Sequence, residues 1–283
     1  MNLQTIGIIG AGTMGNGIAQ VCAVAGINVT LLDICAGALE KALATVGKNL
    51  DRQVSKGLLS ESQKHAALDK IRTSTDYTSL APVQWAIEAA TENLELKRRV
   101  LQQIAAHVDE RCVIASNTSS LSITELAASV NAPERFIGLH FFNPVPVMGL
   151  IEVIRGLQTS DATHAQAIEL AQYLGKTAIT AGNRPGFVVN RILVPMINEA
   201  ILVLQEGLAS AEDIDAGMCL GCNQPIGPLA LADLIGLDTL LAILEAFYDG
   251  FQDSKYRSAP LLREMVAAGY LGRKTGRGFH SYG

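Results

Sequence analysis

The sequence has no surplus of basic residues. Its 283 residues include 22 Lys and Arg against 27 Asp and Glu, which gives a formal net charge of −5 at pH 7. Nucleic-acid-binding proteins usually carry a basic surplus, so we expect no nucleic-acid partner. Any anionic ligand must therefore be held by a local group of basic side chains.

Long uninterrupted apolar runs are also missing. The first charged residue is Asp33, yet glycines and the amides of Asn16, Gln20 and Asn28 interrupt the stretch before it. A transmembrane helix needs about 20 consecutive apolar residues. We therefore expect no membrane-spanning segment and no membrane partner.

Cysteine is sparse. The five cysteines are scattered, mostly through apolar or helical stretches, which is typical of a reducing compartment, so we expect a cytoplasmic protein. Cys219 and Cys222 form a CxxC pair, but no second pair and no nearby histidine accompany it. Chance spacing is the better interpretation, and we predict no metal site.

Residues 5–33 carry the most informative pattern of the chain. An apolar run over 5–9 meets the glycine turn 10–15, and small residues follow over 16–23. A second apolar run, 29–32, ends in Asp33. A strand, a tight glycine turn, a helix and a strand that ends in an acid together predict a dinucleotide site rather than an ordinary βα turn.

Each residue of this motif has a physical reason. Gly10 allows the sharp turn, Gly12 lets the backbone approach a pyrophosphate, and Gly15 lets helix and strand pack closely. The pyrophosphate would bind the exposed amides at the helix N-terminus. Asp33 would accept hydrogen bonds from the adenosine ribose and repel the extra phosphate of NADP. No Arg or Lys follows it before Lys41, so we predict NAD.

Strands and helices alternate through the first two thirds of the chain, which predicts a mostly parallel, Rossmann-type sheet with ligands at the carboxyl ends of its strands. A helix capped by Ser122 or Thr124 should end before Pro133. The other predicted helices cover 36–70, with a break at 56–60, then 92–108 and a stretch that ends at 174; the predicted strands cover 85–91, 112–115, 136–141, 150–154 and 177–180.

The pattern becomes purely helical after about residue 184, so we predict an NAD-binding Rossmann domain over 1–184 and an all-helical substrate and dimerisation domain over 185–283. Residues 187–206 are apolar almost all round, despite Pro195, which should kink a helix. Such a helix must be buried on every side. A domain of about 100 residues cannot easily do that alone, so we expect a homodimer.

His140 is the best candidate for acid–base chemistry. Histidine titrates near neutral pH, and His140 ends a predicted strand at the edge where such sheets bind ligands. Glu152 lies on the next predicted strand, and a carboxylate beside an imidazole fixes its tautomer and stabilises its cation. A core histidine bonded only to backbone remains the alternative.

Two further polar residues are candidates for holding a substrate oxygen. Ser119 lies in a hydroxyl-rich loop after a predicted strand, where a local turn or a helix cap is the alternative. Asn190 is an amide in an apolar stretch, so it must bond either substrate or a neighbouring helix. Lys48, Arg52 and Lys56 are spaced four apart and form a basic stripe on a helix, either solvated or able to bind phosphates.

Five segments, in this order, match one known family: Gly10-Ala-Gly-Thr-Met-Gly15, Ser116-Asn-Thr-Ser-Ser120, His140-Phe-Phe-Asn-Pro-Val-Pro146 with Glu152 after it, Pro185-Gly-Phe-Val-Val-Asn-Arg191 and Lys274-Thr-Gly-Arg-Gly-Phe279. The sequence resembles the short-chain 3-hydroxyacyl-CoA dehydrogenases of the bacterial 3-hydroxybutyryl-CoA dehydrogenase type, over essentially the whole chain. Gly149 is a departure, because relatives often carry a lysine after the VPVM segment.

The resemblance implies a homodimer that interconverts (S)-3-hydroxyacyl-CoA and 3-oxoacyl-CoA with NAD. It implies that His140 is the catalytic residue, that Glu152 orients it, and that Ser119 and Asn190 bond the reacting oxygen. The implied contacts to the CoA substrate are Ser119, Asn190, Lys48, Arg52 and Lys56. The implied contacts around the cofactor are Gly10, Gly12, Thr13, Met14, Gly15, Asp33, Glu92, Lys97 and Asn143.

Three alternatives stay open at this point. A longer-chain dehydrogenase of fatty-acid β-oxidation would share every motif, because only the acyl pocket differs. A sugar-acid dehydrogenase of related fold would need no CoA. An NAD-binding protein without catalysis would keep the glycine turn, although the His140 and Glu152 pair argues against it.

Overall fold

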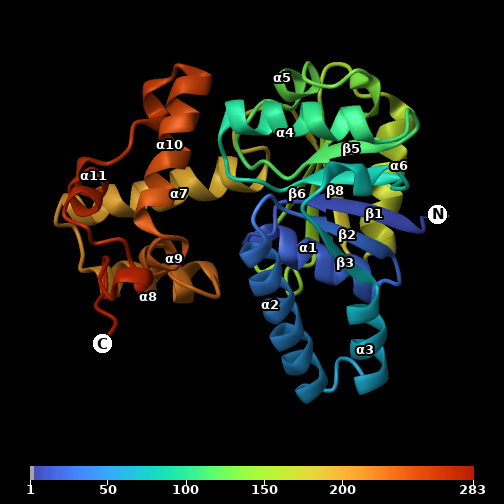
Figure 1. Cartoon of the computed structure of the whole chain (residues 1–283). Helices are drawn as coiled ribbons and strands as arrows, with labels where there is room; N and C mark the ends of the chain where they lie inside the picture. The colour runs from blue at the N-terminus through green and yellow to red at the C-terminus, as the bar shows by residue number, and fades with distance from the viewer. Residues whose placement is uncertain (1–2) are drawn as a thin grey trace. The chain divides into compact units, whose positions relative to one another are not determined.

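The computed structural model describes residues 3–283, and the chain divides into two compact units, 1–183 and 184–283 (Figure 1). Each unit has its own cluster of buried apolar side chains. The first unit is an α/β sheet structure and the second is helical. This confirms the predicted fold class, a mostly parallel sheet followed by an all-helical region.

The first unit is built on one eight-stranded sheet in the order β3-β2-β1-β4-β5-β6-β7-β8. Every neighbouring pair is parallel except β6 and β7. The order reverses between β1 and β4, the place where open α/β sheets bind ligands. The strands are β1 (Thr5–Ile9), β2 (Asn28–Leu32), β3 (Ile71–Ser74), β4 (Trp85–Glu88), β5 (Val113–Ser116), β6 (Phe136–Phe141), β7 (Leu150–Arg155) and β8 (Thr177–Gly182).

Helices cover both faces of this sheet. The buried cluster on one face joins α1, α2 and α6 to alternate strand residues such as Ile6 and Ile8, while α4 and α5 lie on the opposite face (Figure 1). The bounds are α1 (Thr13–Val24), α2 (Ala36–Ser55), α3 (Glu61–Asp69), α4 (Leu94–His107), α5 (Ile123–Ala127) and α6 (Asp161–Tyr173). Both faces of the central strands are thus buried, and chemistry is confined to the strand ends.

The predicted break in the long helical stretch is confirmed. The chain leaves α2 after Ser55, and α3 begins after a capping box in which Ser60 and Gln63 bond each other's backbone. Ser122, rather than Thr124, caps α5. The sequence analysis missed β3, because only Ile71 of its four residues is buried and no alternation marks the strand.

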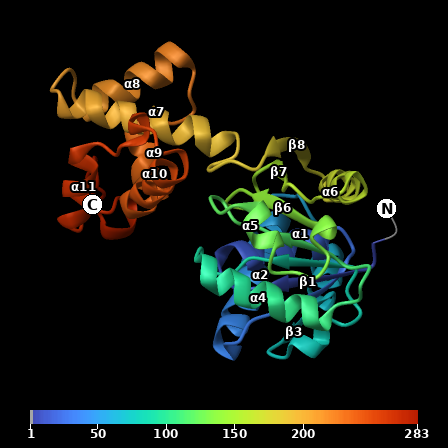
Figure 2. The same ribbon diagram turned by 90° about the horizontal axis from the view of Figure 1, so that it is seen from above.

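The second unit consists of α7 (Val189–Gln205), α8 (Ala211–Cys222), α9 (Pro228–Ile235), α10 (Leu237–Phe251) and α11 (Pro260–Ala267), drawn in orange to red in Figure 2. Within this unit α7 packs against α9, α10 and α11 and runs on through Pro195. Its burial is one-sided: Val194, Ile197 and Ile201 are buried, whereas Ile192 is 68% exposed. One chain alone therefore does not bury this helix on every side.

Two aspartates tie the end of the chain back to the second unit. Asp233 accepts the backbone N–H groups of Phe279 and His280, each at 2.9 Å. Asp215 accepts the N–H of Leu229 at 2.8 Å and lies 2.8 Å from Nε2 of His280. His280 thus takes part in the contacts that hold residues 279–280 to α8 and α9. No helix among residues 3–283 is long and apolar enough to cross a membrane.

Candidate active site

The turn between β1 and α1 has the geometry that its glycines predict. Gly10 has φ +105°, and a Cβ there would lie 2.7 Å from the carbonyl oxygen of Ala89. A Cβ on Gly15 would overlap the carbonyl oxygen of Gly10. A Cβ on Gly12 would meet no protein atom within 4 Å. Packing therefore explains Gly10 and Gly15, whereas Gly12 leaves open space at the N-cap of α1, as a pyrophosphate site requires.

A cavity of about 490 Å³ opens beside this turn. Its lining is mostly apolar, with Ile34, Leu96 and Tyr77 among the side chains and the carboxylate of Asp33 at one side. That carboxylate is held by the N–H of Ala11, 2.8 Å from Oδ2, and of Cys35, 3.0 Å from Oδ1. A carboxylate has room for further donors, so these residues fit an adenosine with its ribose hydroxyls at Asp33.

His140 and Glu152 are directly opposite each other on the antiparallel strands β6 and β7. The distance from Nδ1 of His140 to Oε2 of Glu152 is 2.7 Å, and the two residues are 6% and 0% exposed. The side of the imidazole ring also contacts Phe142. This buried histidine thus faces a carboxylate, which fixes the orientation of the ring.

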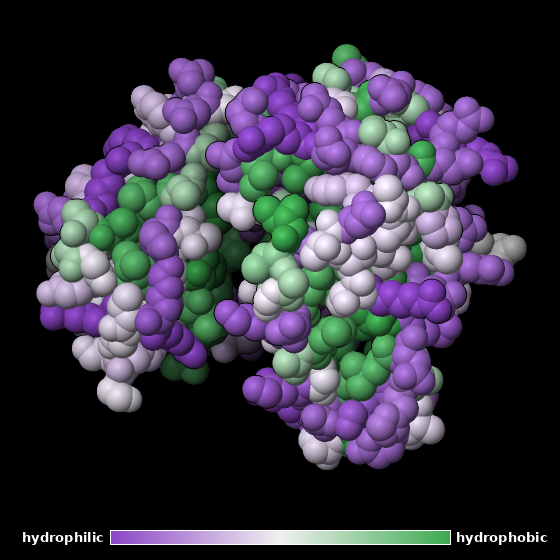
Figure 3. Space-filling model, viewed as in Figure 1, coloured by the Kyte–Doolittle hydropathy of each residue, from purple (hydrophilic) through white to green (hydrophobic). Residues whose placement is uncertain are grey.

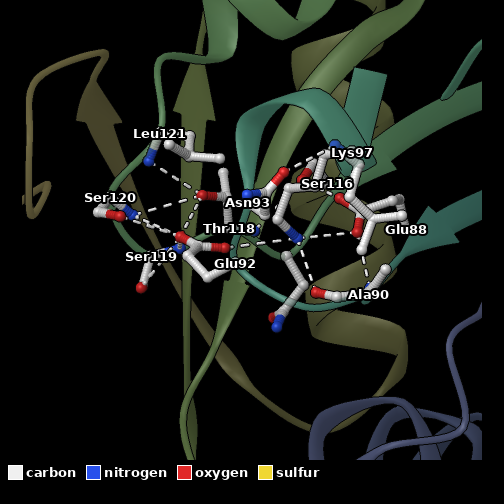
Figure 4. A network of polar contacts seen from close by, with 12 residues as sticks. Glu88, Ala90, Glu92, Asn93, Lys97, Ser116, Thr118, Ser119, Ser120 and Leu121 are labelled. Atoms are coloured by element: carbon white, nitrogen blue, oxygen red, sulfur yellow. Dashed lines mark hydrogen bonds and ion pairs between the residues drawn. The ribbon is translucent and has the colours of Figure 1, made fainter. Parts of the chain in front are cut away.

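The loop that carries Ser119 is gathered around one oxygen of Glu92 (Figure 4). Oε1 of Glu92 accepts the hydroxyl of Thr118 at 2.6 Å and the N–H groups of Ser119 and Ser120 at 2.9 and 3.1 Å. It also accepts the hydroxyls of Ser120 at 3.0 Å and Ser119 at 3.3 Å. Glu92 therefore fixes the position of the whole hydroxyl-rich loop.

Lys97 lies beneath this loop. Its side chain is 1% exposed, and its ammonium contacts Glu88 Oε1 at 2.8 Å, the carbonyl oxygen of Ala90 at 3.0 Å and Glu92 Oε2 at 3.4 Å. Burial raises the pKa of Glu92, but the charge of Lys97 and the hydrogen bonds from the serine loop outweigh it and leave that pKa below its usual value. Glu92 is thus a carboxylate at neutral pH.

The loop after His140 is held by a second lysine. Lys176 is 8% exposed and donates from its ammonium to the carbonyl oxygens of Val145 at 2.8 Å and Met148 at 2.6 Å. Asn143 lies exposed in the same loop, and so does Gly149, where a Cβ would meet nothing within 4 Å. The segment that joins the His140 strand to the Glu152 strand is therefore held in place by hydrogen bonds from Lys176.

The basic stripe lies along α2. Lys48, Arg52 and Lys56 are all exposed, and none makes an ion pair with any residue of the described chain. Asn190 lies in the other unit, on the first turn of α7, where it is half-buried. The structure thus brings His140 to Glu152 and Ser119 to Glu92, and places the basic stripe on a separate helix of the same unit.

The sequence analysis gave no individual role to four residues of the site: Glu88, and Ser116, Asn117 and Thr118 of the hydroxyl-rich segment. Asn117 accepts the N–H of Phe141 at 2.9 Å and so joins the serine loop to the end of β6. Ser116 donates to Glu88 at 2.5 Å. A charged residue within an apolar strand was the available signal for Glu88, because a buried charge needs a partner.

Burial makes two of the cysteines unreactive. It raises the pKa of both Cys22 and Cys112 to about 12, and the thiolate is the reactive form. Neither thiol lies among the residues that form the site.

The doubly wound sheet, with its glycine turn beside a cavity, has the architecture of a dinucleotide-binding domain. Residues 5–184 match the model of the 3-hydroxyacyl-CoA dehydrogenase NAD binding domain, and residues 186–282 match that of the C-terminal domain of the same family. The chain belongs to the 3-hydroxyacyl-CoA dehydrogenase family. Its first domain is an NAD-binding domain, which confirms the predicted cofactor.

Three proteins similar to this chain are named 3-hydroxybutyryl-CoA dehydrogenase or probable 3-hydroxybutyryl-CoA dehydrogenase. The structure is similar to that of (S)-3-hydroxybutyryl-CoA dehydrogenase from Ralstonia eutropha, with 62% identity, a TM-score of 0.97 and 100% of both chains covered. A 3-hydroxybutyryl-CoA dehydrogenase from Bradyrhizobium diazoefficiens is 50% identical, with 99% of this chain and 96% of that protein covered. A probable 3-hydroxybutyryl-CoA dehydrogenase from Bacillus subtilis is 48% identical over 100% of this chain and 98% of its own length.

Proposed function

We propose that this protein interconverts (S)-3-hydroxybutyryl-CoA and acetoacetyl-CoA with NAD. The observation that carries the proposal is the buried His140 and Glu152 pair, 2.7 Å apart, in a sheet whose glycine turn fits the cofactor. The names of relatives at 50% and 62% identity support the substrate. A second copy of the chain and a cytoplasmic location belong to the same proposal.

In the oxidative direction, His140 takes the proton of the substrate hydroxyl. Because Nδ1 faces Glu152, this proton passes through Nε2. The carboxylate of Glu152 stabilises the imidazolium that forms, and keeps the ring in one orientation. NAD, when bound, supplies the acceptor for the hydride that leaves the hydroxyl-bearing carbon. In the reductive direction, protonated His140 returns the proton to the ketone oxygen.

Ser119 and Asn190 are assigned to hydrogen bonds with the reacting oxygen. The position of Ser119, on a loop tied to the end of the His140 strand through Asn117, supports its assignment. The assignment of Asn190 rests on the family resemblance. A donor placed on a developing oxyanion is worth about 100- to 1,000-fold in rate.

The glycine turn, Thr13 and Met14 are assigned to the pyrophosphate of NAD, and Asp33 to the adenosine ribose. Glu92, Lys97 and Asn143 are assigned to the surroundings of the nicotinamide. Because Lys97 is 1% exposed, its assigned role is indirect, through its contact with Glu92.

Lys48, Arg52 and Lys56 are assigned to the phosphates of CoA. Their exposure and the lack of ion-pair partners within residues 3–283 support this assignment, since unpaired cations can make charge-assisted hydrogen bonds to phosphate.

A homodimer would cover the apolar surface that the second unit exposes. Ile192 on α7 is 68% exposed, Leu220 on α8 is 88% exposed and Leu234 on α9 is 54% exposed, and Figure 3 shows hydrophobic residues at the surface of this unit. Light scattering at micromolar concentration should give twice the chain mass of 30.0 kDa. A monomer would contradict the proposal.

The reaction is tested by NADH oxidation with acetoacetyl-CoA at neutral pH, with NADPH and free acetoacetate as the two comparisons. Turnover with NADH and the CoA ester alone would support the reaction, the cofactor and the CoA contact together. Equal turnover of free acetoacetate would remove the CoA assignment. Absence of turnover with every pair would refute the proposed activity.

A further inference from the structure

A buried ion pair beneath the Ser119 loop has no part in the proposed acid–base chemistry. Glu88, at the end of β4, and Lys97, on α4, are 0% and 1% exposed and lie 2.8 Å apart. Replacing such a pair with apolar side chains is often neutral or stabilising, because burial removes water from both charges. Stability alone therefore does not account for the pair, and its contacts point to another role.

The ammonium of Lys97 joins two carboxylates of the β4–α4 segment. An ammonium has three N–H groups, and this one contacts Glu88, the carbonyl of Ala90 and Oε2 of Glu92. Glu88 is held in turn by the N–H of Ala90 at 2.7 Å and the hydroxyl of Ser116 at 2.5 Å. One positive charge therefore fixes the orientation of both Glu88 and Glu92 (Figure 4).

These contacts form a closed ring through the serine loop. Ser116 and Ser119 lie at the two ends of one short segment; Ser116 bonds Glu88 and Ser119 bonds Glu92. The N–H of Thr118 also donates to the hydroxyl of Ser116 at 3.3 Å. Ser119 cannot shift without breaking a contact at one end or the other.

The hydroxyl of Ser119 is the most weakly held of the donors to Oε1 of Glu92. Its distance to Oε1 of Glu92 is 3.3 Å, whereas the other donors to that oxygen lie at 2.6 to 3.1 Å. A carboxylate oxygen offers about two lone-pair sites, so five donors compete for them. The backbone of Ser119 is fixed, while its hydroxyl can turn to a substrate oxygen at little cost.

We propose that Glu88 and Lys97 are positioning residues that, through Glu92, aim the hydroxyl of Ser119 at the reacting oxygen. The inference rests on the role of Ser119 in the proposed function. The charge of Lys97 keeps Glu92 in place, Glu92 holds the backbone of the loop, and Glu88 holds both Lys97 and the start of the loop. None of the three needs to touch the substrate.

The test replaces the ion pair by a neutral pair of similar shape, Glu88→Gln together with Lys97→Met. This double variant removes both fully buried charges, and water can still reach Glu92, whose side chain is 37% exposed, so the variant should fold. The kcat for acetoacetyl-CoA reduction should fall about 10- to 100-fold, because a shift of about 1 Å in a reacting group can cost 100-fold. An unchanged kcat would overturn the proposal.

The Ser119→Ala background shows whether the pair acts through Ser119. Residues that act as one unit have non-additive effects. The double substitution should therefore lower kcat no further once the Ser119 hydroxyl is gone. If the two losses in kcat multiply instead, the pair acts independently of Ser119 and the proposal is wrong.

Arg98→Met is the matched control, because it removes a cation from the same helix. The guanidinium of Arg98 bonds Glu95 and Glu125, each at 2.7 Å, and neither contacts the serine loop. This variant should keep the kcat of the unmodified protein. An equal loss in Arg98→Met would show that any disturbance of α4 lowers kcat, and would overturn the specific role of Lys97.

Hydrogen exchange over residues 117–121 gives a readout that needs no turnover. The N–H groups of Ser119 and Ser120 donate to Glu92, so they should exchange faster in the double variant and not in Arg98→Met. If the unmodified protein does not reduce acetoacetyl-CoA, the proposed function fails while this measurement still tests the ring. Unchanged exchange in the double variant would overturn the inference, whatever the turnover.

Discussion

Two loops at the carboxyl ends of the strands each rest on a buried lysine, but the two lysines have different partners. Lys97, under the loop 117–121, contacts carboxylates. Lys176, under the loop 142–149, contacts backbone carbonyl oxygens and makes no ion pair with any residue of the described chain. Both are nearly inaccessible, at 1% and 8% exposure.

The difference shows two ways of using a buried charge. Burial lowers the pKa of Lys176, and its ammonium donates to backbone carbonyl oxygens of its loop. Lys97 neutralises carboxylates and so sets the orientation of the side chains that hold Ser119. One loop is fixed through its backbone, and the other through a set of charges that side-chain substitution can alter.

The largest loss of turnover is expected at His140, on the strand before the loop that Lys176 holds. His140→Ala should lower turnover by about 100- to 10,000-fold, the usual contribution of positioned acid–base catalysis. NADH binding, followed by fluorescence, should persist. His140→Gln is the matched variant, because an amide can still donate to Glu152 but cannot carry the proton; turnover near that of the unmodified protein in either variant would remove His140 from the mechanism.

Replacing Lys97 and Lys176 one at a time compares how much each buried lysine contributes to stability. Lys97→Met leaves the carboxylate of Glu88 buried without its cation, so the free energy of unfolding should fall by about 3–5 kcal/mol. Urea denaturation measures this loss. The Glu88→Gln and Lys97→Met double variant should recover most of the lost stability, and equal stability of the single and double variants would contradict the account.

Lys176→Met should cost less. It leaves carbonyl oxygens at Val145 and Met148 without a donor, and a buried unsatisfied group costs about 1–3 kcal/mol. Because Met148 is 39% exposed, water can replace one of the two bonds. The same urea experiment should therefore rank Lys176→Met as more stable than Lys97→Met; the reverse order would mean that the carboxylates are not what distinguishes the two anchors.

The smallest effect concerns pH. The pKa of Glu92 lies below its usual value of 4.5, so its contribution to stability is fully present above that pH and is lost as the pH falls through the lowered value. Glu92→Gln cannot titrate. The difference in the free energy of unfolding between the two proteins should therefore narrow as the pH falls below about 4.5, and a constant difference down to pH 3 would show that Glu92 is not held as a carboxylate.

The local features of the site could be read from the sequence because they depend on neighbours in the chain. The glycine turn works through the backbone of residues 10–15, and the structure has the positive φ at Gly10 that its role requires. His140 and Glu152 lie on consecutive strands of a hairpin, so the pairing of side chains across the hairpin brings them together.

The partners of Ser119 could not be predicted in this way. Glu92 and Ser119 are 27 positions apart, and they meet because β4 and β5 are parallel neighbours whose ends lie at one edge of the sheet. The sequence does not state how deep Lys97 lies, since a lysine near the start of a helix is usually exposed. Burial of Lys97 follows from the packing of α4 on β4.

The sequence by itself determined the alternation of strands and helices apart from β3, the cofactor turn, the histidine with its acid and the change to a helical second region. Periodicity and glycine positions are local properties of the chain. Only the tertiary structure decided which charges meet. The pairing of β4 with β5 brought the serine loop to Glu88 and Glu92, and burial there made one ammonium the common partner of two carboxylates. Charged side chains that are close in sequence can each be solvated at the surface, and they interact strongly only where packing excludes water from between them.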